Sequence, residues 1–180
     1  MITGIQEKQK KSYEVLKGTL GLKNHMAMPR ITKVVVSVGT GKHTRTDKKK
    51  NEFVEARLAK ITGQKPVARS AKISIASFKL REGEVIGYSV TLRKKRMNDF
   101  LDRFLNIAIP RIRDFRGFDP KAVDEMGNLT FGIKEHNVFP ETADEELKDV
   151  FGLAVTIVTT AKNKKDALAY FEAIGIPFKK

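Results

Sequence analysis

The sequence predicts an α+β fold with a mostly antiparallel sheet, helices on one face of it and an open opposite face. Several segments alternate apolar with small polar residues, and such a strand offers one face to a core and the other to solvent. The segments between them carry apolar residues at helical spacing, in numbers that cover one side of a sheet only. No repeat or linker divides the 180 residues, so we expect a single domain over residues 1–180.

The first half of the chain supplies two helices and two strands. Residues 1–20 suit an amphipathic helix, with Ile5, Tyr13, Leu16 and Leu20 at helical spacing. Residues 31–38 are rich in β-branched side chains and predict a strand. Its inner face comprises Val34, Val36 and Val38, and its outer face Lys33, Val35 and Ser37. A helix with the apolar stripe Val54, Leu58 and Ile61 follows, and a short strand comes after Pro66.

The second half opens on a strand whose two faces differ sharply. Its apolar face holds Ile86, Tyr88, Val90 and Leu92, and its polar face Gly87, Ser89, Thr91 and Arg93. A helix follows Arg96 and is expected to end at Pro110. Residues 128–134 and 153–160 repeat the two-faced strand pattern, and a last helix runs to Gly175 with Leu168, Phe171 and Ile174 facing inward.

Residues 70–83 allow two interpretations. Three cations (Lys72, Lys79 and Arg81) meet only Glu82 as a counter-charge, and apolar residues are interleaved with them. The segment is either a hairpin that continues the sheet or a protruding basic loop with an aromatic tip. Periodicity favours neither.

Charge separates the last third of the chain from the rest. The net charge is +14, distributed as +9 over residues 1–60, +7 over 61–120 and −2 over 121–180. Such asymmetry indicates a polyanionic partner for the first two-thirds. We favour a nucleic acid over a merely solvated basic surface, because the cations coincide with loops and polar strand faces.

The residues of common catalytic and metal sites are absent or badly spaced. There is no cysteine, which excludes disulfides and thiolate ligands. The turn Gly39-Thr40-Gly41-Lys42 lacks the spacing of a phosphate-binding loop, and His43 stands where Ser or Thr belongs. The three histidines lack ligand spacing. We therefore predict no catalytic residue, no metal and no cofactor. The chain also lacks a membrane-spanning run and a signal-peptide core, so we expect a cytoplasmic protein without a membrane partner.

The order and spacing of eight motifs identify a resemblance to the large-subunit ribosomal protein five family. The motifs are MPRITKVVVSVGTG (28–41), ITGQKP (61–66), SFKLREG (77–83), VTLR-x-x-RM (90–97), IPRIRDFRGF (109–118), GNLTFGIKEHNVFPE (127–141), VFGLAVTIVTTAK (150–162) and IPF (176–178). The resemblance implies a sheet with helices on one side, similar to an RNA-recognition fold. The family usually carries Asn where Ser37 stands and Gly where Lys94 stands.

The resemblance also implies the partners. Members bind 5S ribosomal RNA in the central protuberance of the large subunit, beside 23S ribosomal RNA and neighbouring large-subunit proteins. The expected ribosomal RNA contacts are Lys33, Ser37, Gln64, Ser89, Thr91, Arg93, Arg111, Arg113 and Arg116. No aromatic side chains stand where an RNA-recognition strand would stack bases, so hydrogen bonds to phosphates, sugars and 2′-hydroxyls are expected instead.

Two further contacts are implied by the family. The loop at residues 70–83 would approach the tRNA in the P site through Lys72, Lys79 and Arg81, with Phe78 bracing the loop. The acidic stretch would touch a basic head protein of the small subunit, ribosomal protein thirteen, as an inter-subunit bridge. Its residues are Glu141, Asp144, Glu145 and Glu146.

Overall fold

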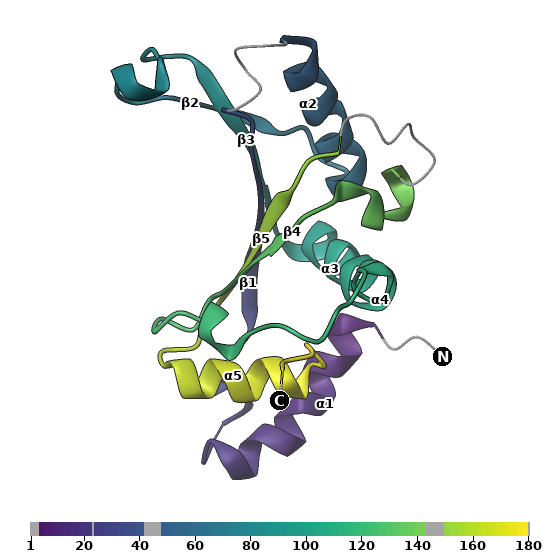
Figure 1. Cartoon of the computed structure of the whole chain (residues 1–180). Helices are drawn as coiled ribbons and strands as arrows, with labels where there is room; N and C mark the ends of the chain where they lie inside the picture. The colour runs from purple at the N-terminus through teal and green to yellow at the C-terminus, as the bar shows by residue number, and fades with distance from the viewer. Residues whose placement is uncertain (1–3, 23, 42–47, 143–149, 180) are drawn as a thin grey trace. The chain divides into compact units, whose positions relative to one another are not determined.

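The computed structural model describes residues 4–22, 24–41, 48–142 and 150–179, and in them it shows an α+β fold built on one sheet (Figure 1). The strands are β1 (Ile31–Gly39), β2 (Val67–Ser70), β3 (Val85–Leu92), β4 (Leu129–Ile133) and β5 (Leu153–Thr159). Their order in the sheet is β2-β3-β1-β5-β4, and the sheet is antiparallel. The predicted fold class is confirmed.

The helices are α1 (Ile5–Thr19), α2 (Lys48–Thr62), α3 (Lys94–Arg103), α4 (Ile109–Arg111) and α5 (Lys164–Ala173). A π-helical turn, Phe104–Ala108, joins α3 to α4, and in it the Ile109 N–H donates to the Phe104 carbonyl. The prediction that Pro110 ends the helix is wrong by one residue. Pro110 is the second residue of α4, and the helix continues to Arg111.

The chain divides into two compact units that interleave along the sequence. The first unit comprises residues 1–34, 92–131 and 156–180, and the second comprises 35–91 and 132–155. This division does not test the expectation of a single domain over residues 1–180, which stays a prediction.

The first unit has an aromatic core. The Phe131 ring stacks on Phe104 at 5.1 Å between centroids and packs against Phe118 at 4.4 Å. Helix α1 packs against α3 and α5, and its Ile5 N–H donates to Asp102 Oδ1 over 2.6 Å.

Two of the predicted helical faces in this unit are shifted from their expected positions. In α5, Leu168 is only half-buried while Tyr170 is fully buried, and this burial raises the pKa of Tyr170 to about 12. In α1, the buried residues are Ile5, Ser12 and Leu16, and Tyr13 lies at the flank of the buried face.

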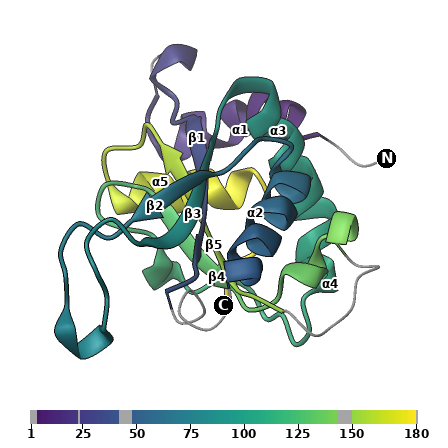
Figure 2. The ribbon, with the colours of Figure 1, turned by 90° about the horizontal axis from the view of Figure 1, so that it is seen from above.

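The second unit places a helix on one face of its strands. The inward side chains of α2, Val54, Leu58 and Ile61, are buried as predicted. The pKa of Tyr88 on β3 is raised by burial and then by Glu55 and Glu52 of α2, so the helix covers the Tyr88 face of the strand. Figure 2 shows α2 on one side of β3 and the β2–β3 connection on the other. The residues that alternate with Tyr88 on β3 therefore face away from α2.

Candidate nucleic-acid interface

The face of the second unit opposite α2, here called the polar face, is partly exposed and carries polar side chains beside Val35 and the exposed Val67. Ser37 on β1 and Thr91 on β3 are half-buried, as is Gln64 in the turn before β2. The Gln64 Nε2 donates to the Thr91 carbonyl over 3.4 Å, which ties the turn after α2 to the end of β3. Three of the predicted RNA-contacting residues thus belong to one compact unit, and two of them are hydrogen-bonded to each other.

Ser89 departs from the sequence-based expectation of an exposed hydroxyl. It is 7 % exposed, and Arg69 of β2 donates from Nε to its Oγ over 2.6 Å. In the ladder Arg69 pairs with Gly87, so its side chain lies on the Ser89 face and reaches that residue diagonally. The exposed group at this position is therefore the Arg69 guanidinium. Sequence reasoning missed Arg69, although alternation along β2 was a signal that could have found it.

Close approach of the strands explains Gly87 on the same face. A Cβ at this position would lie 2.6 Å from the Val38 carbonyl oxygen of β1, which no side chain tolerates. Glycine here lets β1 and β3 pair closely beneath the polar surface.

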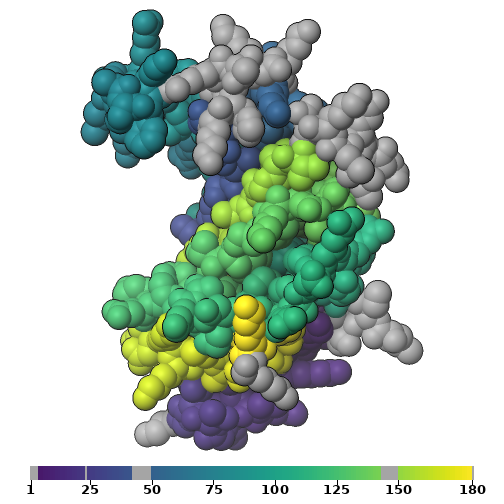
Figure 3. All heavy atoms as spheres, in the orientation of Figure 1, coloured from purple at the N-terminus to yellow at the C-terminus, as the bar shows by residue number. Residues whose placement is uncertain are grey.

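Residues 70–84, here called the finger, form a hairpin and a protrusion at once. Backbone hydrogen bonds join Ala71 to Glu84 at 2.8 Å and Ile75 to Leu80 at 3.0 and 3.1 Å. A single 3₁₀ turn, Ala76–Phe78, closes the tip. In Figure 3 the atoms of the finger form a lobe of their own. Both interpretations that the sequence left open are therefore correct in part.

The finger exposes the side chains that the sequence analysis singled out. Lys72, Lys79 and Arg81 are exposed, and the Lys79 backbone adopts the left-handed region with φ 45°. The expectation that Phe78 braces the loop is wrong, because its side chain is 67 % exposed. An exposed aromatic ring among cations suits contact with a base or sugar rather than support of the loop.

The predicted arginines of the first unit lie on its surface. Arg93 precedes α3 and is exposed, and Lys33 on β1 is half-buried. Arg111, Arg113 and Arg116 are exposed on α4 and the loop that follows it.

The loop after α4, which carries Arg113 and Arg116, is attached to the C-terminal segment. The Phe118 N–H donates to the Pro177 carbonyl and the Lys179 N–H to the Phe118 carbonyl, both over 2.8 Å. Gly117 precedes this attachment with φ 99°, and a Cβ on it would lie 2.7 Å from the backbone of Phe178. The contact that holds the loop in place therefore requires glycine.

The acidic stretch falls only partly within the described residues. Glu141 is half-buried, whereas Asp144, Glu145 and Glu146 lie outside the described residues. The residues that flank the stretch are joined: the His136 N–H donates to the Phe151 carbonyl over 3.1 Å, and the Phe151 N–H donates to His136 Nδ1 over 3.4 Å. The two rings stack at 4.2 Å. Burial and, to a lesser extent, Arg57 lower the pKa of His136.

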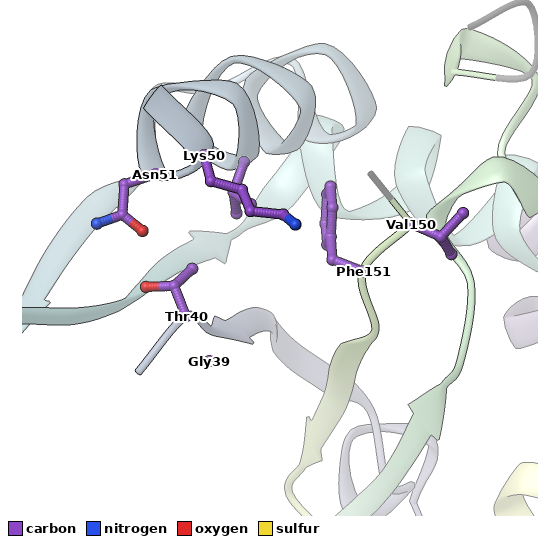
Figure 4. Close-up of a pocket in the computed structure, with 7 residues that line it drawn as sticks. Gly39, Thr40, Lys50, Asn51, Val150 and Phe151 are labelled. Atoms are coloured by element: carbon purple, nitrogen blue, oxygen red, sulfur yellow. The ribbon is translucent and has the colours of Figure 1, made fainter. Parts of the chain in front are cut away.

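The glycine turn after β1 contributes to a small pocket rather than a phosphate cradle. The pocket is lined by Gly39, Thr40, Lys50, Asn51, Val54, Val150 and Phe151 (Figure 4). Its volume of about 10 Å³ has room for one water molecule and not for a nucleotide. Lys42 and His43 of the same turn lie outside the described residues.

The described residues, with their gaps at 23, 42–47 and 143–149, hold no group of three or more His, Cys, Asp or Glu side chains that could bind a metal ion. Within the same ranges, no helix combines the length and apolarity needed to cross a membrane.

Comparison with known proteins agrees with this geometry. The family profile described as ribosomal protein L5 matches residues 24–81, and the profile that describes the C-terminus of the same ribosomal family matches residues 85–178. Three similar relatives are all called large ribosomal subunit protein uL5. That of Dichelobacter nodosus is 47 % identical over 164 residues, 91 % of each chain. That of Mesoplasma florum is 48 % identical over 161 residues, 89 % of each chain. That of Syntrophotalea carbinolica is 52 % identical over 161 residues, 89 % of this chain and 87 % of its own.

An α+β sheet with exposed arginines and a cationic finger gives the chain a basic surface. The matched family is one of structural proteins that are not enzymes. The chain belongs to the ribosomal protein L5 family. It is thus a structural constituent of the large ribosomal subunit, where its partners are ribosomal RNA and ribosomal proteins.

Proposed function

We propose that the polar face of the second unit binds 5S ribosomal RNA and so fixes it in the central protuberance. The observation that carries the proposal is the arrangement of Arg69 and Thr91 on the strand face opposite α2, with Gln64 bonded to the Thr91 carbonyl at the end of β3. Arg69 adds a charge, while Ser37 and Thr91 offer hydroxyls. Such groups recognise phosphates and 2′-hydroxyls, which are what an RNA helix displays in its shallow groove.

The exposed arginines of the first unit bind ribosomal RNA as well. Arg93, Arg111, Arg113 and Arg116 are exposed, and Lys33 is half-buried on β1. Guanidinium groups form paired hydrogen bonds to phosphate oxygens, which suits a contact with the 23S ribosomal RNA beside the 5S molecule. Ser89 contributes indirectly in this proposal, because its hydroxyl holds the Arg69 side chain.

A mobility-shift titration tests the 5S proposal. The purified full chain is titrated with 5S ribosomal RNA and with an unrelated RNA of equal length, at the same salt concentration. Specific binding predicts a far higher affinity for the 5S molecule. Equal affinities for the two RNAs would contradict the proposal and indicate a general RNA chaperone. A binding protein also predicts no turnover of RNA or nucleotide in the same mixtures.

The finger is proposed to contact the tRNA in the P site. The family resemblance assigns this role to the loop, and its exposed Lys72, Lys79 and Arg81 provide the charge that tRNA phosphates require. Phe78 at the tip adds a ring able to stack. Replacing the three cations by Gln should weaken P-site tRNA binding to ribosomes that carry the variant, while 5S binding stays unchanged.

The acidic stretch is proposed to contact ribosomal protein thirteen of the small subunit. The charge sign and the family resemblance support this assignment, and the His136–Phe151 contacts hold the flanks of the stretch together. Reversing Glu145 and Glu146 to Lys should weaken subunit association and leave 5S binding intact. Unchanged association would remove the bridge from the proposal.

A further inference from the structure

We infer that α1 and the turn after it form a stacking platform for an unpaired base of ribosomal RNA, built from Tyr13, His25 and Met26. The Tyr13 and His25 rings meet edge to face at 4.7 Å between centroids, with 62° between their planes. His25 is exposed, and the Met26 side chain beside it is 76 % exposed. Two rings therefore lie together at the surface of the first unit, and the exposed Met26 follows His25 in the same turn. The sequence pattern had placed Tyr13 in the apolar stripe.

The turn that carries His25 and Met26 is fixed against α1. The Asn24 side chain caps the 3₁₀ turn His25–Ala27 by accepting from the Met26 N–H over 3.1 Å. After the turn, the Met28 sulfur lies 3.8 Å from the Ser12 hydroxyl oxygen, whose proton goes to the Gln9 carbonyl over 2.7 Å. The Asn24 cap and the ring contact between Tyr13 and His25 hold the turn against α1 before a ligand arrives, which lowers the entropy that binding costs.

Cations flank the platform on the helix. Lys10 and Lys17 lie three residues before and four residues after Tyr13, so both share its side of α1, and both are exposed. Glu14, one position after Tyr13, points about 100° away around the helix. A stacked base brings its own phosphates close to these two ammonium groups. An apolar protein surface would instead desolvate them without compensation, so charge selects a nucleic acid as the occupant.

The inference rests on the proposed RNA-binding function but uses none of its residues. The platform lies in the N-terminal segment of the first unit, whereas the proposed 5S face and the finger belong to the second unit. The two proposals can therefore fail separately.

Tyrosine fluorescence provides the test, because the chain has no tryptophan and three tyrosines. Tyr88 is 7 % exposed and Tyr170 is fully buried, so Tyr13 is the tyrosine that a ligand reaches. The full chain is titrated with hexauridylate. A parallel titration of free tyrosine with the same RNA corrects for the light that the RNA absorbs. We expect saturable quenching, which Tyr13→Phe abolishes while anisotropy of labelled hexauridylate still reports binding.

Variants that keep Tyr13 as the reporter test the platform itself. His25→Ala combined with Met26→Ala should raise the half-quenching concentration roughly tenfold, in the range expected for losing stacking on one base. The matched control is Val15→Ala, an exposed apolar residue on another side of α1, which should leave the titration unchanged. Lys10→Gln with Lys17→Gln should weaken quenching and reduce its salt dependence.

Three results would overturn the inference. The first is unchanged Tyr13 emission at concentrations where anisotropy shows hexauridylate bound. The second is an equal shift from Val15→Ala. The third is quenching by another large-subunit protein and none by RNA, which would make the surface a protein contact. Quenching that persists in a chain without preference for 5S ribosomal RNA supports the platform and contradicts the 5S proposal alone.

Discussion

Arg69 lies over Ser89, with its Nε 2.6 Å from the serine hydroxyl oxygen. This pair decides which chemical group the polar face of the second unit presents to solvent. The hydroxyl is buried and already accepts a hydrogen bond, so the group presented to solvent at this position is a guanidinium held in one orientation.

The first prediction separates the two partners of this pair. Arg69→Ala removes the charge that is proposed to contact a phosphate, so it should weaken 5S binding and lower the slope of log affinity against log salt by about 1. Ser89→Ala leaves the charge in place and should weaken binding less. Mobility shifts between about 50 and 200 mM salt measure both effects. A larger loss from Ser89→Ala than from Arg69→Ala would show that the hydroxyl itself touches RNA.

The second prediction concerns the backbone of Lys94. This residue has φ 51°, in the left-handed region, immediately after Arg93. Lys94→Gly should relieve strain and raise the free energy of unfolding by about 1 kcal/mol. The matched control, Lys95→Gly, replaces a helical residue and should lower it by about 1 kcal/mol. Urea unfolding measures both, and a stability loss of the same size in the two variants would contradict the strain at Lys94.

Gly117 gives a third prediction. Gly117→Ala adds a methyl group 2.7 Å from the backbone of Phe178 at a position with φ 99°, so we expect a loss of about 2 kcal/mol in unfolding free energy. In the same unit, Gly18→Ala in α1 meets nothing within 4 Å and should stabilise the protein by about 1 kcal/mol. Thermal unfolding of the two variants should therefore shift in opposite directions. Shifts of equal sign would count against the tight contact at Phe178.

A pH dependence of stability follows from His136. Burial, and then Arg57, lower its pKa, so the folded protein keeps the ring neutral while the unfolded chain protonates at its ordinary value of about 6.5. The contribution of the neutral ring to the free energy of unfolding is complete above that pH. It is lost as the pH falls below that value. Urea midpoints at about pH 7.5, 6.5 and 5.5 should decline more steeply in the wild type than in His136→Gln. Parallel declines would exclude His136 as the cause.

The sequence predicted the inner faces of the strands well: Val34, Val36 and Val38 share one face of β1, and all three are buried. It failed where neighbouring segments decide the outcome. The burial of Ser89 depends on the register of β2 beside β3, and a single-strand pattern contains no such information. Pro110 was placed wrongly because a π turn upstream shifts the hydrogen-bond pattern.

The candidate site was predicted as residue types more than as geometry. Exposure of Arg93 and of the three arginines at 111, 113 and 116 agrees with a surface role. Phe78 was expected to brace the finger and instead is exposed, since the backbone bonds between Ile75 and Leu80 already close the hairpin. Arg69 was missed because its role arises only when β2 lies against β3.

Directed cleavage of RNA tests the central claim most directly, and the absence of cysteine makes it practicable. Ser37→Cys carries a tethered iron chelate on the polar face, and Ala56→Cys carries it on the exposed side of α2, which covers the opposite face of the same unit. With 5S ribosomal RNA bound, we predict hydroxyl-radical cleavage from position 37 and little from position 56. Equal cleavage from both positions, or cleavage from position 56 alone, would contradict binding through the polar face.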